Sequence, residues 1–243
     1  MSIQFDKVQP KNKIQLKQLV DYAFKHNIYD LNFIDTSKIT DMSLLFINCM
    51  HNFDVSGWDV SNVTDMNHMF YNCNMFIGKG LENWDVSKVK NMNYMFTWCK
   101  IFNRDLSNWD VSNVKNTSYM FYCCKNFNCD LSNWDVSKVI NMRHMFRLCK
   151  NFDCDLSNWD VSNVTNTAGM FYYCKNFDCG LSSWDVSNVT CMEYMFTGCE
   201  KFNCDLSDWD ISNITRWKNM FGGCYNMTIP IWYKKLYIVK NKI

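Results

Sequence analysis

Tryptophan recurs along the chain at a nearly constant spacing, and this repetition limits the possible fold more than any other feature. The intervals are 26 and then five times 25 residues, through Trp58, Trp84, Trp109, Trp134, Trp159, Trp184 and Trp209. Ile34 fills the same place one unit earlier, so the chain holds eight units. Repeats of this length are typical of solenoids, in which each unit buries its apolar face only against its neighbours. We therefore predict one elongated solenoid of about eight 25-residue coils.

The pattern inside each unit predicts its secondary structure. Counting from each Trp as position 0, apolar residues lie at +8, +11, +12 and +15, the spacing of one face of a helix. The text N-M-x-x-M-F-x-x-C is therefore predicted as a short helix or a 3₁₀-like turn. In the other half of the unit, partial alternation in segments such as 127–136 predicts a short strand that pairs in parallel with the next coil. The predicted fold class is an α/β repeat solenoid.

The two ends of a solenoid need covers, and the sequence changes at both ends. Residues 1–30 are predicted as an N-terminal cap, 31–226 as the eight-coil solenoid and 227–243 as a C-terminal cap that is apolar and lysine-rich. Within the first cap, residues 12–27 predict an amphipathic helix. Its apolar face contains Leu16, Leu19, Val20, Ala23 and Phe24. Depending on how well the ends are covered, we expect a monomer or an end-to-end oligomer.

Aspartates recur at position +1 and, less regularly, near the end of the unit. The first column contains Asp59, Asp85, Asp110, Asp135, Asp160, Asp185 and Asp210, and the second contains Asp105, Asp130, Asp155 and Asp205. Stacked carboxylates repel one another, so hydrogen bonds from backbone N–H groups or a bound cation such as calcium must offset the repulsion. Local capping is the simpler expectation, because the chain has only eight glycines for ligand loops.

Twelve of the fourteen cysteines form two further columns, joined in four coils as C-x₄-C pairs. These pairs are Cys124 with Cys129, Cys149 with Cys154, Cys174 with Cys179, and Cys199 with Cys204. The first thiol of each pair shares the apolar stripe and is expected to pack as a small hydrophobe, while disulfides and a metal site stay open as alternatives. The second thiol is predicted to be more exposed and more reactive, because Arg104 replaces it in one coil.

The positions predicted to point outward vary most between coils and are rich in aromatic and basic residues. The candidate partner-binding residues are Tyr94, Trp98, Tyr119, Tyr122, His144, Arg147, Tyr172, Tyr173 and Tyr194. Residues of these types dominate protein-binding hot spots. The alternative is that the rings fill the grooves between neighbouring coils.

Composition and motifs exclude several classes of function. The formal charge is +1, with 25 basic and 24 acidic residues, which disfavours nucleic acid as a partner. The chain has no phosphate-binding glycine motif, and its four histidines show no catalytic or metal-binding spacing, so we expect neither an enzyme nor a cofactor. No apolar run is long enough for a signal peptide or a membrane span, so we expect a cytoplasmic protein, in the host cytoplasm if the source is viral.

The text W-D-V-S-N-V-T-D-M-N-H-M-F-Y-N-C, from Trp58 to Cys73, and its copies over about residues 30–226 resemble the BspA-type family of leucine-rich-repeat surface proteins. Members are found in bacterial surface proteins, mycoplasma lipoproteins and giant viruses. The resemblance implies a leucine-rich-repeat-like solenoid that serves adhesion or protein interaction, with no catalytic residues to transfer. Exported members carry a signal or an anchor that this sequence does not show, and two cysteine columns are not general in the family. We therefore predict a non-enzymatic protein-binding scaffold, with a thiol-rich metal-binding or redox-linked structural protein as the alternative.

Overall fold

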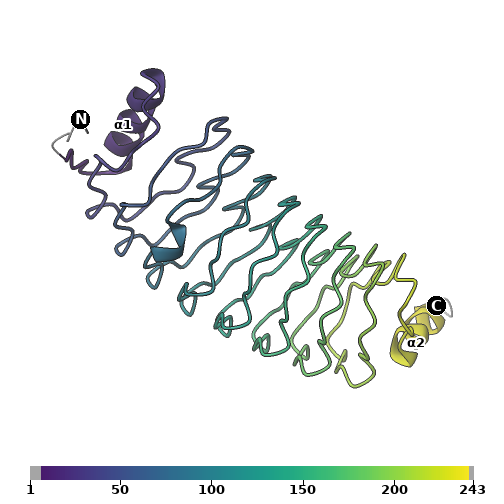
Figure 1. Cartoon of the computed structure of the whole chain (residues 1–243). Helices are drawn as coiled ribbons and strands as arrows, with labels where there is room; N and C mark the ends of the chain where they lie inside the picture. Colours follow the sequence, from purple (N-terminus) through teal and green to yellow (C-terminus); the bar gives the residue numbers. More distant parts are fainter. Residues whose placement is uncertain (1–6, 241–243) are drawn as a thin grey trace.

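The chain winds into a solenoid whose coils follow one another along a single axis, with a helix at each end (Figure 1). This computed structural model describes residues 7–240, and side chains as far as residue 236. The regular elements are α1 (Lys13–Lys25), the 3₁₀-helix η1 (Leu81–Asn83) and α2 (Ile231–Lys240). Within the described residues, the coils between them contain no continuous strand. The predicted solenoid is confirmed, but one strand and one helix per coil is wrong.

The segment predicted as a short helix or a 3₁₀-like turn consists of overlapping tight turns, so the second alternative is the nearer one. In the third coil, the N–H groups of Met95, Thr97 and Cys99 each donate to the carbonyl three residues earlier, at 2.9–3.2 Å. Tyr94 and Trp98 have φ values of 58° and 65°, which a right-handed helix does not contain. The intervening N–H groups leave the coil and donate to the next one, as in the 2.9 Å bond from Phe96 N to Met120 O. Hydrogen bonding between coils therefore replaces the bonding along the chain that a helix requires.

The segment 127–136, predicted as a strand, is also irregular. Pairing between coils is parallel, as expected, but it is reduced to isolated bridges, most of them at position +7. The chain of bridges runs through Asp41, Asp65, Asn91, Asn116, Asn141, Asn166, Cys191 and Arg216. The segment 127–136 turns twice instead, at Asp130 and Asp135, whose carboxylates accept bonds from the N–H groups of Ser132 and Ser137. The partial alternation of apolar residues predicted an extended strand here, but the aspartate side chains stabilise turns instead.

The core is a set of aromatic columns that run along the solenoid axis. The ring of Phe96 stacks on Phe70 and Phe121 in the adjacent coils, with centroid separations of 5.4 and 5.6 Å. Trp109 and Trp134 lie nearly parallel, 6.4 Å apart. Of the six coil tryptophans after Trp58, five also donate their indole N–H to a backbone carbonyl in the preceding coil, as Trp134 Nε1 does to Leu106 O at 2.9 Å. Equal positions in successive units therefore stack, and one continuous core results.

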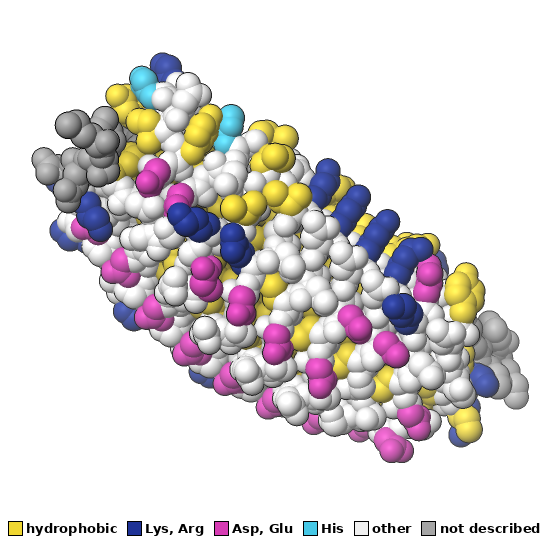
Figure 2. Space-filling model, viewed as in Figure 1, with side chains coloured by type: hydrophobic (Ala, Val, Ile, Leu, Met, Phe, Trp, Pro, Cys, Tyr) yellow, Lys and Arg dark blue, Asp and Glu magenta, His cyan; other side chains and the backbone are white. Residues whose placement is uncertain are grey.

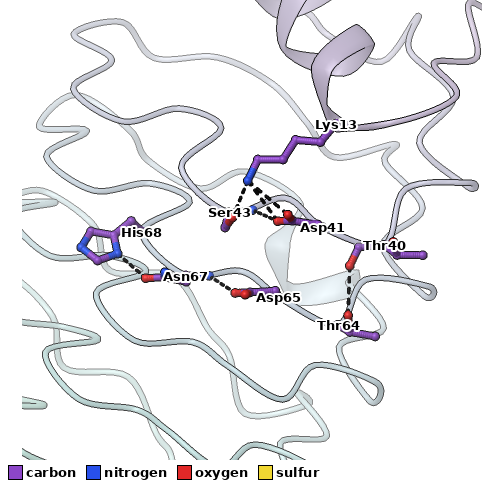
Figure 3. A network of polar contacts seen from close by, with 8 residues as sticks. All are labelled: Lys13, Thr40, Asp41, Ser43, Thr64, Asp65, Asn67 and His68. Atoms are coloured by element: carbon purple, nitrogen blue, oxygen red, sulfur yellow. Dashed lines mark hydrogen bonds and ion pairs between the residues drawn. The ribbon is translucent and has the colours of Figure 1, made fainter.

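Helix α1 covers the first coil and falls within the predicted range 12–27. Asn12 caps it by accepting a bond from Gln15 N, and Leu16, Val20 and Ala23 are buried, with Leu19 and Phe24 partly buried. Lys13 at its start forms an ion pair with Asp41 of the first coil, 3.2 Å from Oδ1, and bonds to Ser43 (Figure 3).

Helix α2 closes the other end by imitating a coil. Trp232 Nε1 donates to Leu206 O at 2.7 Å, the same kind of bond that the coil tryptophans other than Trp84 make. Tyr233 accepts a hydrogen bond from Met220 N at 3.1 Å and packs edge-on against Phe221. The sequence predicts an apolar closing segment, but it does not predict that Trp232 takes the place of a coil tryptophan. The ends of both predicted caps, residues 1–6 and 241–243, lie outside the described residues.

None of the helices described is long and apolar enough to cross a membrane.

Candidate functional site

The nine candidate partner-binding residues lie in three neighbouring columns on one side of the solenoid. Position +10 holds Tyr94, Tyr119, His144 and Tyr194; position +13 holds Tyr122, Arg147 and Tyr172; position +14 holds Trp98 and Tyr173. Most of these side chains are half-buried. His144 is buried at 8% exposure, and Tyr173 is exposed at 39%. We call these nine residues the aromatic strip.

The first column of the aromatic strip is a stack of rings. Tyr94 lies between His68 and Tyr119, with ring centroids 4.3 and 4.4 Å away, and Tyr119 is followed by His144 at 4.7 Å. The stack stops at Gly169, over which the His144 ring lies: a Cβ at this glycine would be 2.2 Å from Nδ1. Tyr94 and Tyr119 therefore fit the groove-filling interpretation, because rings of the adjacent coils cover them, whereas Tyr194 lies beyond the end of this stack.

The other two columns combine rings with cations. Arg147 Cζ lies 3.9 Å from the centroid of Tyr172 and 5.8 Å from that of Tyr122. Lys100 Nζ lies 5.7 Å from the centroid of Trp98, which meets Tyr122 edge to face. Such contacts favour a cation over a ring face and hold both groups in place. Ring edges, hydroxyls and charged ends remain for contact with a partner.

Burial changes the protonation of His144. Desolvation, with help from the charges of Arg147 and Arg143, lowers the pKa of His144 to about 4, while a contact of Nδ1 with Gly169 O at 3.4 Å acts in the opposite direction. The imidazole is therefore neutral at physiological pH, and it serves packing rather than charge recognition.

The first cysteine column belongs to the core, as the packing interpretation predicts. Cys99, Cys124 and Cys149 are fully buried, and each Sγ donates to the carbonyl of a phenylalanine in the preceding coil at 2.9–3.0 Å. Burial raises the pKa of all three thiols well above the ordinary value. Such thiols stay protonated, which makes them poor nucleophiles and poor metal ligands.

The prediction of exposure is wrong for most of the second cysteine column. Cys129, Cys154 and Cys179 are only 7–8% exposed, and burial raises their pKa values to about 12, 11 and 12. Their sulfurs lie among backbone groups, as where Leu131 N donates to Cys154 Sγ at 3.1 Å. Arg104 is tolerated at the equivalent place because its long side chain reaches outward and bonds to Ile77 O. All fourteen cysteines are free, and only Cys49 and Cys204 are half-buried rather than buried.

The aspartate columns act as local caps, and this prediction is confirmed. Every member of the +1 column accepts a bond from the backbone N–H of the serine two residues later, at 2.9–3.0 Å. The four aspartates of the second column do the same. Hydrogen bonds from the side chain and backbone of the following serine lower the pKa of Asp85, Asp135 and Asp185. Figure 3 shows the same turn at position +7, where Asn67 N donates to Asp65.

No group of three histidine, cysteine or acidic side chains is placed to hold a metal ion in the part of the chain that the structure describes.

A column of lysines at position +16 was not predicted from the sequence; it contains Lys100, Lys125, Lys150 and Lys175. Figure 2 shows a row of lysine and arginine side chains along one edge of the solenoid. Identity at one position in four successive units was the signal that could have identified it. These lysines border the aromatic strip, because they follow its last position by two residues.

The repeat matches one family over most of the chain. Residues 14–76, 40–157 and 141–241 match the family described as "Mycoplasma protein of unknown function, DUF285". These three overlapping segments include all eight coils and parts of both caps. The match supports the repeat family, while the finer resemblance to BspA-type surface proteins stays a prediction.

Similarity outside this family is weak. No curated protein matches the chain significantly. A solved structure titled "Crystal structure of TLR13-ssRNA13 complex" is similar at 14% sequence identity and a TM-score of 0.28. The similarity covers 90% of this chain and 38% of the other, so this chain spans well under half of that protein. A TM-score this low gives no information about a ligand.

Proposed function

We propose a binding role for this chain, which belongs to the family of Mycoplasma proteins of unknown function called DUF285. In this proposal it is a non-enzymatic scaffold that binds a protein partner through the aromatic strip. The observation that carries the proposal is the composition of the strip. Half-buried Tyr, Trp and Arg side chains are aligned over five successive coils of a rigid core.

Preorganisation explains why such a strip suits binding. Several of its rings are held by contacts with the next coil, such as Trp98 with Tyr122 at 5.7 Å and Tyr172 with Tyr194 at 6.3 Å. A partner would therefore order few side chains on binding, which removes part of the usual entropic cost. Four coils at ~4.8 Å spacing, with their flanks, offer enough area for a standard interface of about 1,200–2,000 Å².

The test uses the residues of the strip that contribute least to the core. The immobilised chain captures proteins from an extract of its native host, and each captured protein is produced pure and titrated against the scaffold. We expect Tyr122→Ala with Tyr173→Ala to weaken binding by at least about tenfold, because Tyr, Trp and Arg anchors dominate interface energies. Tyr225→Ala is the matched control: Tyr225 is 83% exposed and lies outside the strip. Equal affinity of the double variant and the control would remove the strip from consideration.

The thiol-based alternative has no comparable support. Its ligands or redox groups would be thiols whose pKa is raised by burial in both columns. No specific observation favours it over the binding role.

A further inference from the structure

Positive charge on this protein is concentrated where negative charge is missing. The segments 91–102, 116–127, 141–152 and 166–177 occupy the same place in four successive coils, and they contain no Asp or Glu. Their charged residues are all basic: Lys100, Lys125, Arg143, Arg147, Lys150 and Lys175. We call these six residues the basic edge. The aspartate columns lie in other parts of each coil, and their negative charges reduce the formal charge of the whole chain to only +1.

The cations of the basic edge lie close together and face solvent. Lys100, Lys125 and Lys150 are exposed, and the row is visible along one edge of Figure 2. Burial raises the pKa of Cys123, while the charges of Lys125, Arg147 and Lys100 all act in the opposite direction. One buried thiol beneath this edge therefore lies within the electrostatic reach of three cations from three different coils.

Little within the protein neutralises these charges. Among the described residues, Lys175 is the one member of the edge with a recorded ion pair, to Glu200 at 2.6 Å. Glu200 and Glu193 belong to the following coil, so the basic edge ends there. Lys100, Arg143 and Arg147 lie over aromatic rings, which orient them without removing their charge.

We propose that the basic edge is the part of the binding surface that selects the partner, and that it takes an extended acidic segment of a protein. The inference deepens the proposed function and rests on it. The segment would lie along the solenoid axis, across the lysine column. Four coils span roughly 15–20 Å, which corresponds to about five or six residues of extended chain. Complementary charge then sets the partner's register and speeds its association.

The state of the rings favours an acidic peptide over a single-stranded nucleic acid. Bases bind such strips by stacking on free ring faces. Here Tyr94 and Tyr119 cover each other at 4.4 Å, and Arg147 covers Tyr172 at 3.9 Å. The cations remain available for carboxylates, while the faces needed for bases are occupied.

The test measures binding of a fluorescein-labelled peptide of about six glutamates to the whole chain, by fluorescence anisotropy. We expect the dissociation constant to rise about tenfold or more between about 20 and 200 mM NaCl, because exposed charge pairs are screened. The triple variant Lys100→Gln, Lys125→Gln and Lys150→Gln should bind at least about tenfold more weakly at low salt.

A second triple variant controls for net charge. Lys90→Gln, Lys115→Gln and Lys138→Gln removes the same number of charges from exposed lysines outside the basic edge, and its affinity should stay within about twofold of wild type. No binding by wild type, or equal losses in both triple variants, would overturn the inference. So would tighter binding of an oligothymidylate strand of matched charge, or salt-sensitive self-association that the first triple variant abolishes. A failure in this assay leaves the capture experiment with Tyr122 and Tyr173 intact, so the two proposals can fail separately.

Discussion

The ring of Tyr94 stacks on the ring of Tyr119 in the next coil, with centroids 4.4 Å apart and planes 7° from parallel, although both residues have a φ of 58°. An aromatic residue in the left-handed region is unusual, and the conformation costs about 1–2 kcal/mol without a compensating contact. Ring stacking contributes about 0.5–1.5 kcal/mol per pair. The stacking energy thus offsets the backbone strain of the positive φ values at Tyr94 and Tyr119.

This relationship predicts an unusual order of stability at position 119. Tyr119→Ala and Tyr119→Gly both delete the ring, but only glycine also relieves the positive φ. We expect the Gly variant to be more stable than the Ala variant by roughly 0.5–1 kcal/mol in urea unfolding followed by tryptophan fluorescence. In a helix the order is reversed by about 1 kcal/mol, so finding Ala more stable would restore the helical interpretation of this segment.

The tryptophan column offers a matched pair of variants. Trp134 Nε1 donates to Leu106 O at 2.9 Å, whereas buried Trp84 Nε1 has no acceptor among the described residues. Both Trp→Phe changes remove a similar volume, but only Trp134→Phe removes a hydrogen bond, after which Leu106 O keeps the bond from Trp109 N at 3.0 Å. We expect Trp134→Phe to cost about 1–2 kcal/mol more than Trp84→Phe in the same unfolding assay. Equal costs would mean that the indole bonds contribute nothing to the stacking of coils.

His144 should make stability depend on pH. Its folded pKa of about 4 lies below its ordinary value of 6.5, so the unfolded chain takes up the proton first as the pH falls. The contribution of His144 is complete above about pH 6.5 and is lost progressively towards pH 4, by about 3 kcal/mol.

The measurement compares wild type with His144→Asn, since asparagine tolerates the φ of 56° at this position. The difference between the two stability curves isolates His144 from the aspartates, whose lowered pKa values also reduce stability in acid. A constant difference between pH 7 and pH 4 would contradict the burial of this imidazole.

Thiol reactivity should separate the native chain from the unfolded chain. Twelve of the fourteen cysteines are buried, and Cys49 and Cys204 are half-buried. We expect a disulfide reagent such as Ellman's to modify at most these two in the folded protein and all fourteen in denaturant. Rapid labelling of Cys129, Cys154 or Cys179, mapped by mass spectrometry, would show that the second column is more accessible than its raised pKa values indicate.

The sequence could predict those features of the fold that arise because equivalent positions of successive units stack on one another. The tryptophan spacing predicts the coils, and the recurrence of Asp85 and Ser87 predicts the capped turns, because both follow from identity between units. It could not predict the path inside a coil. Inward residues at Met92, Met95, Phe96 and Cys99 are spaced alike in a helix and in overlapping turns. What separates the two is hydrogen bonding between coils, which connects residues 24 positions apart, as from Met92 N to Asn116 O.

A local signal for the turns was nevertheless present. Glycine and asparagine, the residues that best tolerate positive φ, recur at positions +10 and +14, as Gly169, Asn219, Asn72, Gly198 and Gly223. For the candidate site, variation between coils located the aromatic strip. Which rings were buried depended on neighbours such as Gly169, whose missing side chain admits the His144 ring.

Trp232 of α2 bonds to Leu206 O in the way that Trp209 bonds to Leu181 O one coil earlier. Helix α2 therefore packs on the last coil through the same kind of leucine carbonyl that the coils offer to one another. A gene for this chain can gain or lose whole units in frame without a new terminal junction having to arise. The reach of the surface, and with it the length of the partner segment it accommodates, can then change during evolution by simple duplication or deletion.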